Sequence, residues 1–335
     1  MISAVLIGLG QVAWKFDEEP GRKVAWSHLG AYHALSDEIA VMGGYDPSDT
    51  AREAFSRRHP DIPVFTDIGE MMRHCKPEII SICAPNGQHH AALKEAFAAH
   101  VPRAVWCEKP MATTVEHARD MAETCNRHGT ILIVSYVRRW HPLWRRFKDR
   151  LESGEIGEIQ SLRIAMPNRL WTIGSHAVDL LCWLGGPVSH MQAMPVPKLE
   201  QSGEPAVSAM LLFENGASGH LQISGMRENL LVEAEAIGTE GRLICREGPG
   251  IITAEAYAES TRYDGYRELG EPTQEAIEVP PSHSPFVAIA REIADLLSGR
   301  ISEGSCTPDS ALLVQSLLQT MSEAASGERP AGYSI

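Results

Sequence analysis

The sequence predicts a two-domain α/β protein, in which a doubly wound parallel sheet precedes a domain built on an antiparallel or mixed sheet. The chain opens with an apolar run, residues 2–7, that leads directly into a Gly-x-Gly-x-x-Ala turn at residues 8–13. Short apolar runs then alternate with helical patterns as far as residue 135, which favours a parallel sheet covered by helices. Beyond that point strands predominate, and Asn215-Gly216 is typical of a hairpin turn. A chain of 335 residues is long enough for two domains.

Apolar runs predict the strands of the first domain, and stretches with helical spacing of apolar residues predict the helices between them. The expected strands are 2–7, 39–45, 78–83, 103–107 and 131–135, and the expected helices are 49–58, 68–74, 88–100 and 115–128. Residues 14–26 interrupt this alternation with a turn signal, Asp17-Glu18-Glu19-Pro20-Gly21. We therefore expect an inserted loop there, before Ser27-His28 restarts a helix.

The second half of the chain reads as strands framed by helices. The expected helices are 143–153, 175–184, 283–299 and 307–325, with Ser175 as the N-cap of the second. The expected strands are 159–166, 206–213, 217–224, 232–237 and 242–245. Residues 255–282 are polar and rich in proline, so we expect a surface excursion there.

Composition excludes several classes of function. A net charge of −13 offers no basic face for nucleic acid. The 7 cysteines form no Cys-x-x-Cys pair, so neither a disulfide framework nor a zinc site is predicted, and a reducing cytoplasm is expected. The start of the chain lacks the basic stretch of a signal peptide, and no apolar run approaches the roughly 18 residues that span a bilayer. We expect no metal, no nucleic acid and no membrane partner.

The opening turn predicts a dinucleotide site. Gly8 and Gly10 allow the backbone to approach a pyrophosphate, and Gln11 and Val12 start the helix whose N–H groups face it. Asp46 follows the second strand, where a carboxylate accepts from the adenine ribose and repels a 2′-phosphate, which favours NAD. Arg52, a few residues further on, keeps NADP open. Two unrelated strand-end turns are the alternative interpretation.

Two further loops follow strands of the first domain. Ala84, Pro85, Asn86 and His89 come after the strand at 78–83, where loops line the ligand crevice; the alternative is that His89 and its neighbour His90 face solvent. In the next loop, Glu108-Lys109-Pro110 follows the strand at 103–107. Because Pro110 limits Lys109 to extended conformations, the lysine is held stiffly, which is unusual for the alternative, a solvated surface lysine.

A second cluster lies at the start of the helix expected at 175–184. His176 and Asp179 are three residues apart, so they share a helix face. His176 lies in the first turn, where the helix dipole disfavours imidazolium, so a neutral histidine is suited to act as a base. The alternative is a capping or core histidine.

These stretches together resemble the Gfo/Idh/MocA family of nicotinamide-dependent oxidoreductases. The matching motifs are Gly8-Leu9-Gly10, Pro85-Asn86-x-x-His89, Glu108-Lys109-Pro110, Arg139-Trp140, Gly154-Glu155-Ile156-Gly157, Gly174-x-His176-x-x-Asp179 and Gly238-Thr239-Glu240-Gly241. The resemblance implies a Rossmann domain over residues 1–135 and an α+β domain over 136–335 with a large open sheet that builds homodimers or homotetramers. It also allows the C-terminal helix to pack back on the first domain.

The same resemblance implies an activity and a set of roles. The expected activity is NAD(P)-linked oxidation or reduction at a sugar, cyclitol or nucleotide-sugar carbon, with NAD as cofactor and NADP as the alternative. Lys109 would hydrogen-bond the reacting oxygen, and His176 would exchange the proton. Glu108 and Lys109 would also line the cofactor. The expected substrate-binding residues are Tyr136, Arg138, Arg139, Asn168, Arg169, Thr172 and Asp179.

One residue departs from the family pattern. Catalytic members usually carry Asp four residues before the histidine, and here that position is Thr172, which cannot ionise. Asp179 or substrate contacts would then compensate, or the proton would pass through Lys109 or Tyr136. The alternatives are a redox-neutral NAD-dependent glycosidase or lyase, and a non-catalytic NAD-binding regulator or scaffold.

Overall fold

The chain folds into two compact units. The computed structural model describes all residues except 168, 197–204, 224–230, 281, 328–331 and 335. The first unit comprises Met1–Trp140 with Pro280–Gln315, and the second comprises His141–Val279 with Ser316–Ile335. The sequence predicted a boundary between residues 135 and 136 and allowed the C-terminal helix to pack back on the first domain. The first unit extends to Trp140 and also includes Pro280–Gln315.

The first unit is built on a parallel sheet. Its strands are β1 (Ile2–Ile7), β2 (Ile39–Tyr45), β3 (Val64–Phe65), β4 (Ile79–Ile82), β5 (Ala104–Cys107) and β6 (Ile131–Val134). They lie in the order β3-β2-β1-β4-β5-β6, and neighbouring strands pair in parallel. This confirms the predicted doubly wound sheet. The order reverses between β1 and β4, which places a ligand crevice at the carboxyl ends of those strands.

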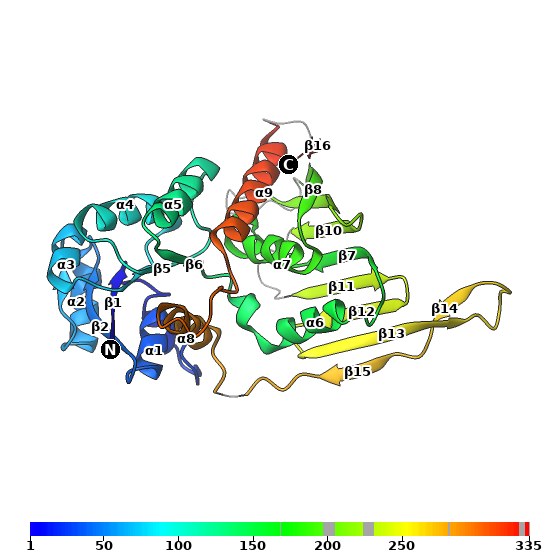
Figure 1. Ribbon diagram of the computed structural model, residues 1–335, viewed down its shortest axis with the longest axis horizontal. Coiled ribbons are helices and arrows are strands. Elements are labelled where there is room, and N and C mark those ends of the chain that lie inside the picture. The colour runs from blue at the N-terminus through cyan, green and yellow to red at the C-terminus, as the bar shows by residue number, and fades with distance from the viewer. Residues whose placement is uncertain (168, 197–204, 224–230, 281, 328–331, 335) are drawn as a thin grey trace. The chain divides into compact units, whose positions relative to one another are not determined.

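Helices cover this sheet, and polar side chains fix where several of them begin. They are α1 (His28–Ala34), α2 (Asp49–Arg58), α3 (Ile68–Cys75), α4 (His89–Ala99), α5 (Val115–Arg127) and α8 (Pro285–Leu297) (Figure 1). Ser27, Ser48, Asp67, Thr114 and Ser284 each accept a backbone N–H of the first turn that would otherwise lack a partner. β4 and β5 are fully buried, as expected for strands with helices on both faces.

The segment 14–26 is a loop that contains one short 3-10 helix, η1 (Lys15–Glu18), and residues 18–23 are exposed. The indole Nε1 of Trp14 donates to the carbonyl oxygen of Leu9 at 3.0 Å, in the Gly-x-Gly turn. The Asp17 carboxylate accepts from the backbone N–H of Trp26 and from the Ser27 hydroxyl. The insertion is therefore tied both to the dinucleotide turn and to the start of α1.

The second unit is built on a large mixed sheet. Its strands are β7 (Ile159–Ala165), β8 (Val188–Pro195), β9 (Val207–Phe213), β10 (Ser218–Ile223), β11 (Glu233–Gly238), β12 (Gly241–Arg246), β13 (Ile251–Glu259), β14 (Arg267–Leu269), β15 (Thr273–Ala276) and β16 (Gly332–Ser334). The order is β14-β13-β12-β11-β7-β10-β9-β8-β16, with β15 beside β13. β7 and β10 pair in parallel, and the other neighbours pair antiparallel. The predicted α+β domain is confirmed.

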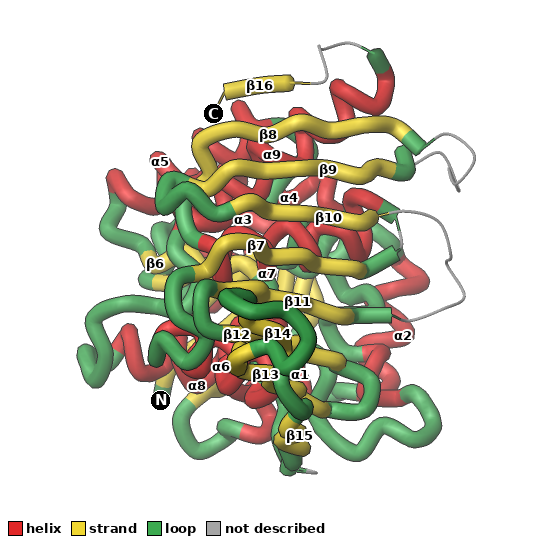
Figure 2. Tube along the Cα trace, turned by 90° about the vertical axis from the view of Figure 1, so that its right-hand side faces the viewer, coloured by secondary structure: helices red, strands yellow, loops and turns green. Residues whose placement is uncertain are grey.

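One face of this sheet packs against helices. α7 (Ser175–Gly185) contacts β7 and β10, and α6 (Pro142–Glu152) contacts β12 and β13. Figure 2 looks onto the opposite face, where β8, β9, β10 and β7 lie in front of the helices. α9 (Pro308–Ser326) follows α8, and the division between the two units falls within it.

Several strands were not predicted. The region 255–282, expected to be an irregular excursion, contains the end of β13 together with β14 and β15. β14 and β15 are short, largely exposed and held by backbone pairing with β13, so they carry little apolar pattern. β8 was also missed, although its buried Val188, Met191 and Ala193 carry a signal in the sequence. β3 and β16 are too short to give one.

Two of the glycine-rich family motifs meet in a turn–turn contact. The N–H of Glu240 donates to the carbonyl oxygen of Ile156 at 2.8 Å. In return, the N–H of Glu158 donates to Oγ1 of Thr239 at 3.1 Å. These motifs therefore join the start of β7 to the β11–β12 turn and serve the architecture of the second unit.

Candidate active site

A cavity of about 540 Å³ opens at the carboxyl ends of β1, β2 and β4 in the first unit. Phe16, Tyr45, Pro47, Gln88 and Glu95 are among the residues that line it. The residues predicted to bind cofactor that also line it are Gly8, Gly10, Gln11, Val12, Asp46, Ala84 and Pro85. Within the fully described stretch 1–140, Asn86, His89, Glu108 and Lys109 are not among the lining residues. The structure thus brings the dinucleotide part of the predicted site together in one hollow.

The two glycines of the opening turn have different physical reasons to be glycine. Gly8 has a φ of +93°, and a Cβ there would lie 2.6 Å from the backbone nitrogen of Ala84. A Cβ on Gly10 would meet nothing within 4 Å. Gly8 is therefore required by the packing of β1 against the end of β4. Gly10 leaves open space above the backbone, as the approach of a ligand requires.

Asp46 is held in place at the end of β2. Its Oδ2 accepts from the N–H of Leu9 at 2.9 Å, and its Oδ1 accepts from the N–H of Ser48 at 2.9 Å. The guanidinium of Arg52 donates to the backbone oxygen of Asp46 and to the Asp49 carboxylate. Each carboxylate oxygen of Asp46 keeps further acceptor capacity for ribose hydroxyls, and Arg52 is engaged elsewhere.

His89 is buried, with 1% of its surface exposed. Its Nε2 lies 2.8 Å from the carbonyl oxygen of Ala84, and its Nδ1 lies 3.1 Å from that of Pro110. Burial lowers the pKa of His89, against the opposing effect of its hydrogen bonds and of Glu108. The ring therefore links the loop after β4 to the loop after β5. By contrast, His90 pairs with Asp120 at 2.7 Å and is part-exposed.

Glu108 is a carboxylate held by groups from separate segments of the chain. Its Oε1 lies 3.1 Å from Nε2 of His28, and its Oε2 accepts from the N–H of Lys109 at 3.4 Å. Burial acts to raise the pKa of Glu108, but His28, Ser135 and the charge of Lys109 outweigh it, so the pKa is lowered. The carboxylate is therefore ionised. His28 was predicted only as a helix start, and nothing near it in sequence indicates its partner 80 residues away.

Lys109 lies in the turn that follows β5 and is half-buried, and a cis peptide bond joins it to Pro110. On the next segment, Tyr136 is fully buried and Arg138 is half-buried. Arg139 is 4% exposed, and its guanidinium donates to the carbonyl oxygen of Ser305 at 2.8 Å. Arg139 thus ties η3 (Val137–Trp140) to the segment that precedes α9.

The predicted histidine helix of the second unit starts in an unexpected way. A π-helical turn, Leu170–Gly174, runs directly into α7, so the N-cap is Gly174 and not the predicted Ser175. A Cβ on Gly174 would lie 2.6 Å from Cγ2 of Ile223 in β10, so this position requires glycine. Such π turns are rare and occur frequently at functional sites.

The π turn carries the residue that departs from the family pattern. Thr172 lies within it and is half-buried, and its carbonyl oxygen accepts from the Ser175 hydroxyl at 3.3 Å. His176 and Asp179 follow in α7 and are 7% and 1% exposed. Arg169 precedes the turn and is half-buried, whereas Asn168 lies outside the described residues.

No group of three or more His, Cys, Asp and Glu side chains in the described part of the chain could hold a metal ion. No described helix is both long enough and apolar enough to cross a bilayer.

Family models agree with this architecture over more than half of the chain. Residues 20–136 match an oxidoreductase family with an NAD-binding Rossmann fold, and residues 168–244 match the GFO/IDH/MocA C-terminal domain. The chain belongs to the Gfo/Idh/MocA family. The predicted resemblance is confirmed, and so is the predicted NAD-binding fold of the first unit.

Individual relatives of this Gfo/Idh/MocA protein are distant. D-glucoside 3-dehydrogenase of Escherichia coli (strain K12) is 26% identical over 158 residues, which are 47% of this chain and 41% of that protein. The match therefore spans less than half the length of that relative.

Solved structures match the fold over nearly the whole chain. The WlbA dehydrogenase from Bordetella pertussis, solved with NADH and UDP-GlcNAcA, is 18% identical with a TM-score of 0.77, and covers 100% of this chain and 98% of that one. A super-repressor mutant of Gal80p from Saccharomyces cerevisiae is 15% identical with a TM-score of 0.78, and covers 99% and 97%. At these identities the likeness shows the Gfo/Idh/MocA fold alone.

Proposed function

We propose that this protein is an NAD-dependent dehydrogenase or reductase that transfers a hydride between nicotinamide and a carbinol or ketone carbon of a sugar, cyclitol or nucleotide-sugar. One observation carries the proposal. The hollow lined by Gly8, Gly10 and Asp46 lies at the strand-order switch of an NAD-binding fold. The Glu108-Lys109-Pro110 turn follows β5, whose neighbour in the sheet is β4.

The cofactor is proposed to lie along the hollow of the first unit. Gly10 would pass under the pyrophosphate, and Asp46 would accept from the adenine ribose, because its carboxylate is already oriented by Leu9 and Ser48. Ala84, Pro85 and Asn86 would lie towards the nicotinamide ribose. A fixed carboxylate repels a 2′-phosphate, so NAD should bind more tightly than NADP, which calorimetry with both dinucleotides would test.

The two glycines separate cofactor binding from stability. Gly10→Ala should weaken NAD binding measured by calorimetry, yet hardly change the thermal unfolding midpoint, since its Cβ meets no protein atom. Gly8→Ala should lower the unfolding midpoint even without cofactor, because its Cβ meets the backbone of Ala84. Equal NAD affinity for Gly10→Ala and the wild type would place the dinucleotide elsewhere.

The chemistry is proposed to rest on two side chains. Oxidation removes a hydride from the carbinol carbon and a proton from its hydroxyl, leaving a carbonyl, and bound NAD supplies the hydride acceptor. Lys109 hydrogen-bonds the reacting oxygen and stabilises its changing charge. His176 exchanges the hydroxyl proton. The proposed substrate anchors are Tyr136, Arg138, Arg139, Asn168, Arg169, Thr172 and Asp179.

A panel of sugars, cyclitols and nucleotide-sugars tests the activity through the absorbance of reduced nicotinamide. The wild type should reduce NAD with at least one member, and Lys109→Ala should abolish most of that rate. Lys94→Ala is a matched control, because Lys94 lies on α4 and pairs with Asp120 on the exposed surface. A loss of equal size in both variants would remove the proposed role of Lys109.

Thr172 favours two other candidate functions. A chain without the usual aspartate could bind NAD without turnover and act as a regulator, and the fold of Gal80p, named as a super-repressor mutant, is similar. Alternatively, it could cleave a glycoside with no net change in the cofactor. Tight NAD binding with no turnover across the panel would favour the regulator. Glycoside cleavage at constant nicotinamide absorbance would favour the hydrolase or lyase.

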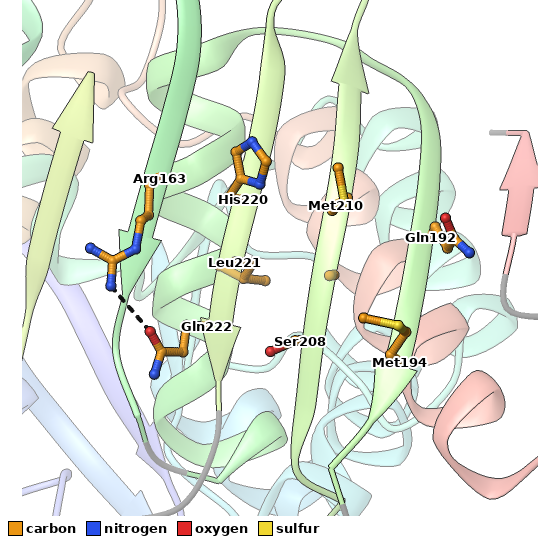
Figure 3. A pocket seen from close by; sticks show the side chains of 9 residues that line it. Arg163, Gln192, Met194, Ser208, Met210, His220, Leu221 and Gln222 are labelled. Carbon is orange, nitrogen blue, oxygen red and sulfur yellow. Dashed lines mark hydrogen bonds between the residues drawn. The ribbon is translucent and has the colours of Figure 1, made fainter. Parts of the chain in front are cut away.

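The open face of the second unit is proposed to join copies of the chain in a homodimer or homotetramer. Met194, Met210 and Leu212 are 54%, 53% and 43% exposed there, and the two methionines line a hollow of about 290 Å³. Figure 3 shows Met194 and Met210 on neighbouring strands, and the hydrogen bond between Arg163 of β7 and Gln222 of β10 on the same face. An exposed apolar surface with polar neighbours is typical of a protein interface.

A charge placed in this surface would test the assembly. Met210→Glu should reduce the mass measured by light scattering at micromolar concentration, whereas Met42→Glu in β2, 43% exposed in the first unit, should not. A strictly monomeric wild type would contradict the proposal. None of the 7 cysteines forms a disulfide, which supports the proposed cytoplasmic location.

A further inference from the structure

A chain of hydrogen bonds connects α1, β4 and the turn after β5 in the first unit. Oη of Tyr32 lies 2.7 Å from Oγ of Ser81, which lies 3.0 Å from Nδ1 of His28. On the other side of the same ring, Nε2 of His28 lies 3.1 Å from Oε1 of Glu108. Oε2 of Glu108 then accepts from the backbone N–H of Lys109 at 3.4 Å. The chain of bonds therefore ends at the backbone of Lys109.

The protonation states of these groups determine which atom donates in each hydrogen bond. His28 is fully buried, which lowers its pKa despite the opposing hydrogen bond and charge of Glu108, so the ring is neutral. An ionised Glu108 can only accept, so the imidazole proton lies on Nε2 and Nδ1 accepts from Ser81. Burial raises the pKa of Tyr32 well above its ordinary value, so its hydroxyl remains a donor to Ser81. Every donor therefore points towards Glu108.

The surroundings prevent the His28 ring from turning. Its centroid lies 3.7 Å from that of Trp106 in β5, at an interplanar angle of 30°. Phe286 of α8 contacts the same ring edge-on at 5.8 Å, with an interplanar angle of 68°. The titratable groups that act on this cluster are Tyr32, Cys83, His89, Cys107, Glu108 and Lys109. The same aromatic contacts hold the ring with Nε2 on the carboxylate.

We propose that His28 is a positioning residue for Lys109. Its imidazole donates to Glu108 and holds the carboxylate against the backbone N–H of Lys109. His28 thereby determines the position from which the lysine side chain extends. The inference rests on the proposed role of Lys109 in hydride-transfer chemistry. His28 itself touches no reacting atom. The ionised carboxylate also stabilises the positive charge of Lys109, since the interaction between them is mutual.

The kinetic test uses three variants of the full chain. His28→Leu removes the donor, His28→Gln keeps an amide donor, and His90→Gln is the control, because His90 lies on the surface of α4. His28→Leu should lower kcat about a hundredfold, the scale of a misplacement of roughly 1 Å, with KM for NAD unchanged. The kcat of His28→Gln should be at least tenfold higher than that of His28→Leu. Equal kcat for His28→Leu and the wild type, or no recovery with His28→Gln, would overturn the proposal.

Two measurements that do not require turnover make the test independent of the proposed function. Nitrogen NMR of the imidazole should show the proton on Nε2 at neutral pH, and a proton on Nδ1 or on both nitrogens would overturn the proposal. The rate at which an amine reagent modifies Lys109, mapped by mass spectrometry, should change in His28→Leu while that of Lys94 stays constant. An unchanged Lys109 rate would overturn it too. If the NMR and modification results hold and no substrate is oxidised, only the proposed function fails.

Discussion

The turn that carries Lys109 and the helix start that carries His176 are stabilised in different ways. The first is fixed by side-chain hydrogen bonds, in which His28 and His89 reach Glu108 and Pro110 from separate elements. The second is fixed by backbone geometry, a π turn that fits against β10 because Gly174 has no side chain. The first region should therefore be sensitive to the loss of polar groups, and the second to the gain of volume.

The largest expected effect is on turnover, and it compares Lys109 in the first region with His176 in the second. Lys109→Ala should reduce kcat/KM by roughly a hundredfold to a thousandfold, the usual cost of one transition-state hydrogen-bond donor. His176→Ala should lose less, because Thr172 supplies no carboxylate to hold an imidazolium. Steady-state kinetics on the substrate found by the panel measures both. A larger loss for His176→Ala would make the helix start the dominant half of the site.

Gly174→Ala tests whether the helix start that carries His176 is sensitive to added volume. The added Cβ would lie 2.6 Å from Cγ2 of Ile223, so the variant should lose about 1–3 kcal/mol of unfolding free energy, as overpacked cores do. Gly248→Ala is the control, since its Cβ meets nothing within 4 Å. Denaturant unfolding measures both, and Gly174→Ala should cost less in an Ile223→Ala background than in the wild type. Equal stability of the two glycine variants would contradict a close fit.

Acidification should first destabilise the region around Lys109, which side-chain hydrogen bonds hold in place. The pKa of His28 is lowered from its ordinary 6.5 by burial, so its contribution to stability is complete above pH 6.5 and is lost as the pH falls through the folded-state pKa. The lowered pKa of Glu108 adds a second loss that begins below its ordinary 4.5. Thermal unfolding followed by circular dichroism should show a falling midpoint in this window.

His28→Gln identifies the source of that acid sensitivity. Because the amide does not titrate, the fall in unfolding midpoint between pH 6.5 and 4.5 should be shallower than in the wild type. Some dependence should remain, since the buried His89 also has a lowered pKa. A slope for His28→Gln identical to the wild type would assign the acid sensitivity to other groups.

Thr172→Asp should have the smallest effect. A carboxylate within the π turn would restore the usual partner of His176, so turnover should be kept or rise, and the pKa that governs the rate should rise because the imidazolium is stabilised. The pH dependence of kcat/KM measures this. A large fall in turnover would instead mean that this site runs a chemistry suited to the threonine.

Local patterns in the sequence were sufficient for the framework of both units. Buried parallel strands such as β4 and β5 read as continuous apolar runs, and the Gly8-Leu9-Gly10 turn marks the end of β1. The residues that line the hollow of the first unit followed, because carboxyl ends of neighbouring parallel strands meet at one edge. In these cases, the residues that determine a strand or a turn lie within it or next to it in the sequence.

Contacts between distant residues could not be predicted in this way. The partnership of His28, Ser81 and Glu108 joins three segments that share no local pattern, so only the fold reveals it. The π turn depends on the fit of Gly174 against Ile223, which nothing near residue 174 in the sequence records. The polar edge strands β14 and β15 rely on pairing with β13 rather than on apolar side chains.

The return of residues 280–315 to the first unit has a consequence for synthesis. Trp106, His28 and the end of α1 are covered in part by Phe286 and its neighbours in α8, which leave the ribosome long after the strands they protect. A nascent chain that ends at Trp140 therefore lacks the contacts that α8 makes with Trp106 and His28. The first unit is complete only after residues 280–315 have been synthesised, so it cannot finish folding before most of the second unit has emerged.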